Sequence, residues 1–185
     1  MNLPNKLTML RILLVPVFVA FASIQKWSYQ IVATAIFIIA SFTDMLDGRI
    51  ARSQHLVTDF GKFMDPIADK MLVMSALVML VEHNRMPGWV CMLMLAREFA
   101  VSGFRLVAAG KGKVIAAGIW GKLKTISQMI YIPMALMLVP MARHGEDIHD
   151  AWDVLTTIMM YISLALAVWS GFDYIWKNRS YIKDM

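Results

Sequence analysis

Four aspartates with helical spacing are the residues in this sequence best suited to chemistry. Asp44 and Asp47 are three residues apart, and Asp65 and Asp69 are four apart. Residues three or four apart share one face of an α-helix, so each pair predicts an acidic stripe. One pair ends an apolar segment and the other begins the next. A short antiparallel connection would therefore bring both stripes to the same depth.

Converging carboxylates need a counter-charge. In a poorly hydrated place they repel one another and resist ionisation, unless they take up protons or bind cations. Oxygen ligands without His or Cys favour Mg²⁺, Mn²⁺ or Ca²⁺ over zinc. A divalent ion also suits a phosphate substrate, whose oxygens complete the coordination shell. The simpler alternative is that these aspartates cap helix ends. The regular spacing disfavours it for the four, although Asp59 fits an N-cap.

The segments that position these residues are too apolar for a soluble domain. The chain has 185 residues, of which 59% are hydrophobic and only 17% charged, whereas about a quarter of a soluble domain is charged. About 20 apolar residues span a bilayer as a helix, and six such helices are predicted. They cover residues 5–25, 28–50, 60–82, 87–110, 119–142 and 152–176. The expected fold is an all-α membrane protein, one domain of residues 1–185, with a polar cavity facing the cytoplasm.

The basic residues predict the orientation. Lys26, Arg85 and Arg143 are the only basic residues in the three connections on one side, and the opposite side is rich in Lys and Arg. By the positive-inside tendency, that opposite side is cytoplasmic, together with both termini and the aspartates. An acidic loop containing Glu146 and Asp153 is then expected outside. The net charge of +5 follows from this topology and predicts no nucleic-acid partner.

The aspartates belong to a longer pattern. It reads Asp44-Met-Leu-Asp47-Gly48-Arg-Ile-Ala51-Arg52, eight residues, Gly61, three residues, Asp65, three residues, Asp69. This resembles the complete signature of the CDP-alcohol phosphotransferase family, D-x-x-D-G-x-x-A-R-x8-G-x3-D-x3-D, at all eight fixed positions. Four stretches are also similar to the bacterial phosphatidylglycerophosphate synthases of that family. They are the opening Leu3–Arg11, Asp65–Lys70, Ala96-Arg97-Glu98 followed by Arg105, and Gly121–Thr125.

The resemblance implies an enzyme of phospholipid biosynthesis. Its reaction would transfer the phosphatidyl group of CDP-diacylglycerol to sn-glycerol 3-phosphate, giving phosphatidylglycerophosphate and CMP. The resemblance also implies a multi-pass protein of the bacterial cytoplasmic membrane, a homodimer, and dependence on Mg²⁺ or Mn²⁺.

The donor side of the site follows as a hypothesis. Asp44, Asp47 and Asp65 would hold one or two divalent ions against the diphosphate. Asp69 would lie near the metals and, as the resemblance implies, act as general base on the acceptor's hydroxyl. The residues expected to contact nucleotide or diphosphate are Asn5, Thr8, Arg11, Gly48, Ala51, Arg52 and Gly61. Some of these have simpler alternatives: helix capping for Asn5, helix packing for Gly48 and Ala51, and a membrane anchor for Arg52.

The acceptor carries a phosphate of its own, and cations are expected to bind it. The candidates are Arg97, Arg105, Lys122 and Lys124. Arg97 falls near the middle of the fourth predicted helix, where a charged side chain is costly and rarely idle. The alternative is that Arg97 forms an internal ion pair with Glu98 or with an active-site aspartate.

The sequence leaves three other functions open. The first keeps the family but changes the acceptor to serine, inositol, choline or another lipid phosphate. The second is an intramembrane prenyltransferase, although those enzymes look longer and carry two separated aspartate motifs. The third is a divalent-cation transporter, which would spread its acidic residues along a pore. Here the aspartates cluster at one end of two helices.

Overall fold

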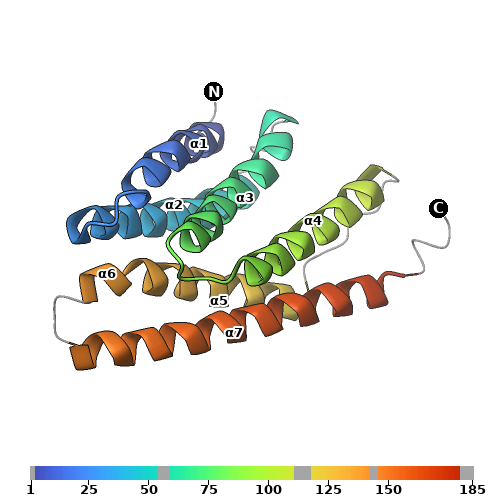
Figure 1. Cartoon of the computed structure of the whole chain (residues 1–185). Helices are drawn as coiled ribbons and strands as arrows, with labels where there is room; N and C mark the ends of the chain where they lie inside the picture. The colour runs from blue at the N-terminus through green and yellow to red at the C-terminus, as the bar shows by residue number, and fades with distance from the viewer. Residues whose placement is uncertain (1–2, 54–58, 111–117, 142–145, 180–185) are drawn as a thin grey trace. The chain divides into compact units, whose positions relative to one another are not determined.

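The computed structural model describes residues 3–53, 59–110, 118–141 and 146–179, and all regular elements in these ranges are α-helices. They are α1 (Leu3–Ala22), α2 (Trp27–Ser53), α3 (Asp59–Glu82), α4 (Gly88–Gly110), α5 (Ile119–Leu136), α6 (Leu138–Met141) and α7 (Glu146–Lys177) (Figure 1). Within these helices, the side chains of residues 3–7, 44–53, 59–66, 69, 109, 139 and 141 are outside the description. The all-α prediction is confirmed over the described ranges.

Two of the predicted boundaries were wrong. The fifth predicted helix is divided into α5 and α6 by a turn at Met137. The last helix begins at Glu146 rather than at residue 152, so the expected acidic loop is helical instead. Glu146 and Asp147 occupy the first turn of α7, where carboxylates stabilise a helix through its positive N-terminal dipole. The acidic residues that were predicted to form a loop therefore stabilise the first turn of α7, which begins before residue 152.

Helix length and hydropathy support the predicted membrane spans only in part. Among the residues described, α7, with 32 residues, is the one helix that is long and apolar enough to cross a membrane. Two shorter apolar stretches are Thr8–Ala22 in α1 and Trp27–Thr43 in α2. Charged residues within α2, α3 and α4 lower the hydropathy of those helices.

The chain divides into two compact units. Unit 1 comprises Met1–Arg85 and Ile132–Asp153, and unit 2 comprises Met86–Tyr131 and Val154–Met185. In unit 1, α1 packs against α2 and α3 (Figure 1). The rings of Phe18 and Phe37 lie 6.0 Å apart in this core. Fully buried alanines such as Ala33 and Ala40 accompany them, and small residues of this kind let helices approach closely.

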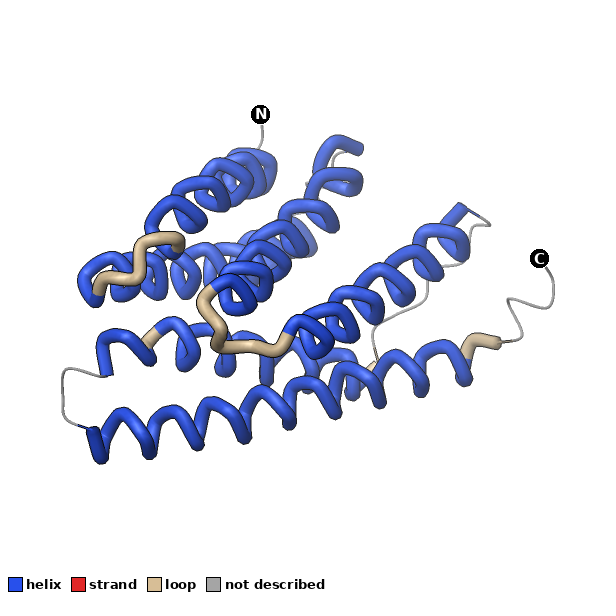
Figure 2. Tube along the Cα trace, in the orientation of Figure 1, coloured by secondary structure: helices blue, strands red, loops and turns tan. Residues whose placement is uncertain are grey.

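Hydrogen bonds from side chains and from the backbone stabilise two turns of unit 1, which are drawn as loops in Figure 2. After α1, Gln30 Nε2 donates hydrogen bonds to the carbonyls of Ala22 and Ile24, at 2.8 and 3.0 Å. After α3, Asn84 adopts a left-handed conformation with φ of 57°. The Arg85 N–H then reaches the Leu80 carbonyl at 2.9 Å, as in a common helix C-terminal motif. Both turns thus satisfy carbonyls that the helix ends leave open.

The break after α5 has a chemical cause. In a continuous helix the Leu136 carbonyl would accept from residue 140, which is a proline without an N–H. Arg85 supplies donors instead, since its Nη1 lies 2.7 Å from the Ala135 carbonyl and 3.3 Å from that of Leu136. Trp152 Nε1 donates to the Met134 carbonyl at 2.9 Å. Two side chains from elsewhere in unit 1 therefore serve three successive carbonyls.

This arrangement predicts that Arg85 stabilises the fold. Arg85→Met should remove a charged donor from two carbonyls and lower the free energy of unfolding by about 2 kcal/mol. The measurement is thermal unfolding of the purified protein in detergent. Lys26→Met, at an exposed position in the α1–α2 turn, is the matched control and should change little. Equal effects of the two substitutions would contradict the capping role.

Candidate active site

The backbone places the four aspartates on two helices of unit 1. Asp44 and Asp47 lie in the C-terminal half of α2, and Asp65 and Asp69 lie in the N-terminal half of α3. The two helices contact each other, and both contact α1. The predicted helical spacing of each pair is therefore confirmed. The aspartate side chains lie outside the described part, so their convergence and their metal binding stay predictions.

The other donor-side residues are described in part. Thr8 and Arg11 are three residues apart on α1, and each is only 1% exposed. A buried arginine is stable only where other groups compensate its charge. Arg11 thus belongs to the interior of the unit that also contains the acidic helices. The side chains of five further predicted residues fall outside the description: Asn5, Gly48, Ala51, Arg52 and Gly61.

Two of the predicted acceptor residues meet in unit 2 through a shared carboxylate. Arg97 Nη1 lies 3.0 Å from Glu98 Oε1, and the Lys124 ammonium from α5 donates to the same oxygen. Lys124 is 3% exposed, and the side chains of Arg97 and Glu98 are 13% and 17% exposed. The ion pair with Glu98, predicted as an alternative for Arg97, is therefore present. Two cations share one carboxylate, which leaves this cluster with one net positive charge.

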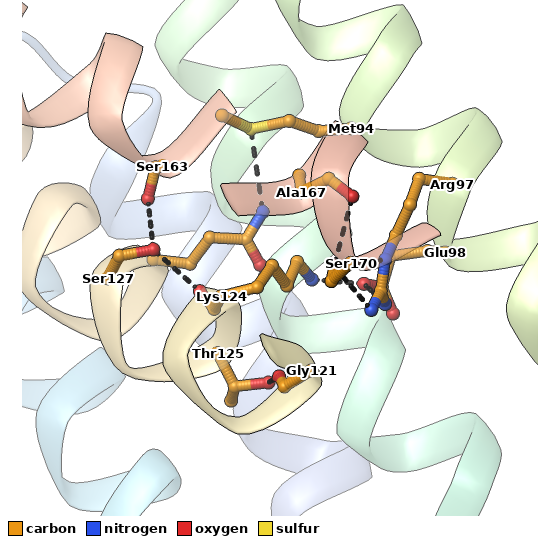
Figure 3. Close-up of polar contacts among 11 residues, drawn as sticks. Met94, Arg97, Glu98, Gly121, Lys124, Thr125, Ser127, Ser163, Ala167 and Ser170 are labelled. Carbon is orange, nitrogen blue, oxygen red and sulfur yellow. Dashed lines mark hydrogen bonds and ion pairs between the residues drawn. The ribbon is translucent and has the colours of Figure 1, made fainter. Parts of the chain in front are cut away.

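A serine on α7 completes the Arg97 environment (Figure 3). Arg97 Nε and Nη2 donate to Ser170 Oγ at 3.1 and 2.8 Å. The Ser170 hydroxyl donates its own proton to the Ala167 carbonyl at 3.0 Å. A hydroxyl has one donor and two acceptor sites. The bond to Ala167 thus turns both oxygen lone pairs toward the guanidinium.

Hydrogen bonds between helices extend the cluster along α5 and α7. Ser163 Oγ donates to Ser127 Oγ at 2.8 Å, and Ser127 in turn donates to the Lys124 carbonyl at 2.8 Å. Gln128 Nε2 lies 3.4 Å from Met94 Sδ, which connects α5 to α4. These contacts lie along the part of α5 that carries Lys124, and Figure 3 draws them as dashed lines.

Arg105 and Lys122, the other two residues predicted to bind the acceptor's phosphate, have different surroundings. Arg105 is half-buried on α4, with its guanidinium carbon 5.3 Å from the centroid of the Tyr174 ring and its Nε 3.4 Å from the Tyr174 hydroxyl. Tyr174 of α7 thereby orients Arg105 by a cation–π contact and a hydrogen bond. Lys122 is exposed on α5. The structure thus groups Arg97 with Lys124, and gives Arg105 a separate partner.

Sequence reasoning missed the residues that α7 contributes. Ser163, Ala167 and Gly171 are four residues apart and buried on one side of α7. Small residues repeated at this interval are typical of a closely packed face of a membrane helix. This repeat could have predicted a packed face of α7, but it does not indicate which side chain of another helix packs against that face.

Comparison with known proteins identifies the family. A family model described as CDP-alcohol phosphatidyltransferase matches residues 1–169. The chain belongs to the CDP-alcohol phosphatidyltransferase family. The match includes all four aspartates of α2 and α3 and the Arg97–Glu98–Lys124 cluster.

Curated relatives cover the whole chain. The CDP-diacylglycerol–glycerol-3-phosphate 3-phosphatidyltransferase of Bacillus subtilis (strain 168) is 38% identical over 194 residues, which cover 98% of this chain and 97% of that protein. Proteins of the same name from Rickettsia typhi and Haemophilus influenzae are 37% and 35% identical, over 97% and 99% of this chain and 98% and 96% of theirs. This family member is therefore similar from end to end to enzymes named for one acceptor.

The shared carboxylate predicts a large stability effect at Glu98. Glu98→Gln should leave Arg97 and Lys124 as two buried like charges and lower the free energy of unfolding by about 3 kcal/mol. Thermal unfolding in detergent is the measurement. Asp173→Asn removes a more exposed i,i+4 ion pair with Lys177 and should cost at most about 0.5 kcal/mol.

A second substitution checks the charge argument. Adding Lys124→Met to Glu98→Gln removes one of the two like charges and should recover part of the lost stability. A further loss in the double variant would show that packing, rather than charge, determines the effect.

Proposed function

We propose that this chain transfers the phosphatidyl group of CDP-diacylglycerol to sn-glycerol 3-phosphate, forming phosphatidylglycerophosphate and releasing CMP. The observation that carries the proposal is full-length similarity to several proteins named for that reaction, at 35–38% identity. The complete family signature from Asp44 to Asp69 supports it. The product is an anionic phospholipid precursor, so the chain acts in phospholipid biosynthesis.

The enzyme works within a bilayer as a single domain of six spans, with α5 and α6 forming one of them. The six long helices have 18 to 32 residues, or about 27 to 48 Å at 1.5 Å per residue, against a hydrocarbon core of about 30 Å. All six expose large apolar side chains, among them Leu13, Ile39, Val78, Leu106, Ile126 and Phe172. The distribution of Lys and Arg supports cytoplasmic termini and a cytoplasmic active site. The family resemblance supports a homodimer.

The aspartates suit a hard divalent ion. Asp44, Asp47, Asp65 and Asp69 offer only oxygen ligands, which fits Mg²⁺ or Mn²⁺. The helical spacing on α2 and α3, and the contact between these helices, support a shared site for one or two ions. When bound, such ions neutralise a diphosphate and the charge that develops on the leaving CMP.

The chain's own residues then have distinct roles. Asp69 takes the proton from the acceptor's hydroxyl as that oxygen attacks the lipid-bearing phosphorus. The residues that contact nucleotide and diphosphate are Asn5, Thr8, Arg11, Gly48, Ala51, Arg52 and Gly61. The burial of Thr8 and Arg11 in the same unit as the acidic helices supports this assignment.

The acceptor's phosphate binds to cations of unit 2. Arg97 and Lys124 are prearranged around Glu98, with one positive charge in excess. Arg105 and Lys122 supply further positive charge on α4 and α5. A guanidinium binds phosphate oxygens through two parallel hydrogen bonds, which gives the site orientation as well as charge.

An assay of CMP release tests the reaction. Purified protein with CDP-diacylglycerol and Mg²⁺ should release CMP only when sn-glycerol 3-phosphate is added, and a chelator should abolish the release. Asp69→Asn should lower kcat by about 10²–10⁴-fold, because it removes the base. Asp153→Asn, at an exposed position on α7, is the control and should keep full activity.

A panel of acceptors separates this function from its alternatives. Release of CMP with serine, inositol or choline, but not with sn-glycerol 3-phosphate, would keep the family and refute the acceptor. Folded protein that releases no CMP with any acceptor would refute the proposed reaction.

Labelling of single cysteines tests the orientation. Cys91 is the only cysteine and is buried, so Cys91→Ala provides a background without thiols. In that background, Asp150→Cys should react with a membrane-impermeant maleimide in intact cells, whereas Arg179→Cys should react only after the membrane is opened. The reverse pattern would invert the topology, and labelling of both would contradict an odd number of spans between them.

A further inference from the structure

Arg97 is held by α7 at both ends of its side chain. Its Nε and Nη2 atoms donate to Ser170 Oγ at 3.1 and 2.8 Å (Figure 3). The aliphatic stem of Arg97 passes over Gly171, the residue that follows Ser170. A Cβ added to Gly171 would lie 2.9 Å from Arg97 Cγ and 3.9 Å from Arg97 Cβ. Real Cβ atoms do not approach other atoms as closely as 2.9 Å, so any residue larger than glycine here displaces the stem.

The position of Arg97 determines that of Lys124. Arg97 Nη1 lies 3.0 Å from Glu98 Oε1, and that oxygen also accepts from Lys124. A shift of the guanidinium therefore moves the carboxylate that orients the ammonium. The Arg97 head also lies close to α5, since a Cβ on Gly121 would be 3.7 Å from Nη2. Restraints from α5 and α7 thus act on one side chain of α4.

Fixing long cationic side chains in advance favours ligand binding. Ordering a lysine or arginine side chain costs conformational entropy. Where the fold has already ordered the side chain, a ligand does not bear that cost when it binds. Neither Ser170 nor Gly171 has a group suited to hold a phosphate by charge.

We propose that Ser170 and Gly171 are positioning residues, which preset Arg97 and, through Glu98, Lys124 for the phosphate of sn-glycerol 3-phosphate. The inference rests on the proposed function, since it names what shapes the acceptor site. Both residues act through Arg97.

The decisive variant is Gly171→Ala, assayed by CMP release while each substrate is varied in turn. The KM for sn-glycerol 3-phosphate should rise about tenfold, because the misplaced cations bind the acceptor less well. The KM for CDP-diacylglycerol and kcat should stay within about twofold, since the donor residues lie in unit 1. Gly103→Ala on α4 is the matched control, because a Cβ there meets nothing within 4 Å, and it should leave both KM values unchanged.

Two further variants keep the test decisive if Gly171→Ala fails to fold. Ser170→Ala removes the acceptor of both Arg97 hydrogen bonds and should raise the same KM, by a smaller factor. In an Arg97→Ala background the Cγ atom is absent, so Gly171→Ala should fit and add no further rise in KM.

The outcomes separate this inference from the function on which it rests. Wild-type protein that releases no CMP with sn-glycerol 3-phosphate overturns both. Active wild type with an unchanged acceptor KM in Gly171→Ala and Ser170→Ala overturns the positioning role alone. An equal rise in both KM values, or an added rise in the Arg97→Ala background, also overturns it.

Discussion

Charged side chains buried in apolar helices must be compensated where they lie, because neither lipid nor a packed interior solvates them. In unit 2 this requirement brings together α4, α5 and α7. Glu98 lies between Arg97 and Lys124, and Ser170 accepts two further hydrogen bonds from Arg97. Removing Glu98 would leave two like charges without the carboxylate that they share. The packing of the helices and the placement of the cations therefore follow from the same contacts.

The same requirement governs the backbone where a helix is interrupted. Pro140 cannot supply the N–H that the Leu136 carbonyl needs, and the chain turns at Met137. Arg85 and Trp152 donate side-chain hydrogen bonds to the carbonyls near this turn. Gln30 donates to the carbonyls at the end of α1. In water these carbonyls would be hydrated, so the use of side chains here is consistent with helix ends that water reaches poorly.

How much the sequence predicted depends on the range of each interaction. The helices carrying the aspartates were predictable, because the spacing of Asp44 and Asp47 indicates one face of a single helix and the apolar runs indicate its length. The start of α7 was not, because Glu146 and Asp147 have the composition of a loop but also suit a first helical turn. The bond between Arg97 and Ser170 joins residues 73 positions apart. Helical periodicity cannot predict such a contact, and the small-residue repeat of α7 marks only a packed face.

Charge counting around Glu98 bears on which alcohol suits this site. With one carboxylate and two cations, the cluster retains one positive charge, and Arg105 on the same helix adds another. If the acceptor's phosphate binds here as proposed, a phosphate-bearing acceptor gains from both charges, whereas choline, a cation, is repelled. Serine and inositol carry no net charge and gain little. Burial strengthens these differences, since Lys124 is 3% exposed and water screens it poorly. A second carboxylate here would neutralise the cluster and leave only the charge of Arg105, so the site would discriminate less. The imbalance between cations and Glu98 thus supports the proposed acceptor, sn-glycerol 3-phosphate.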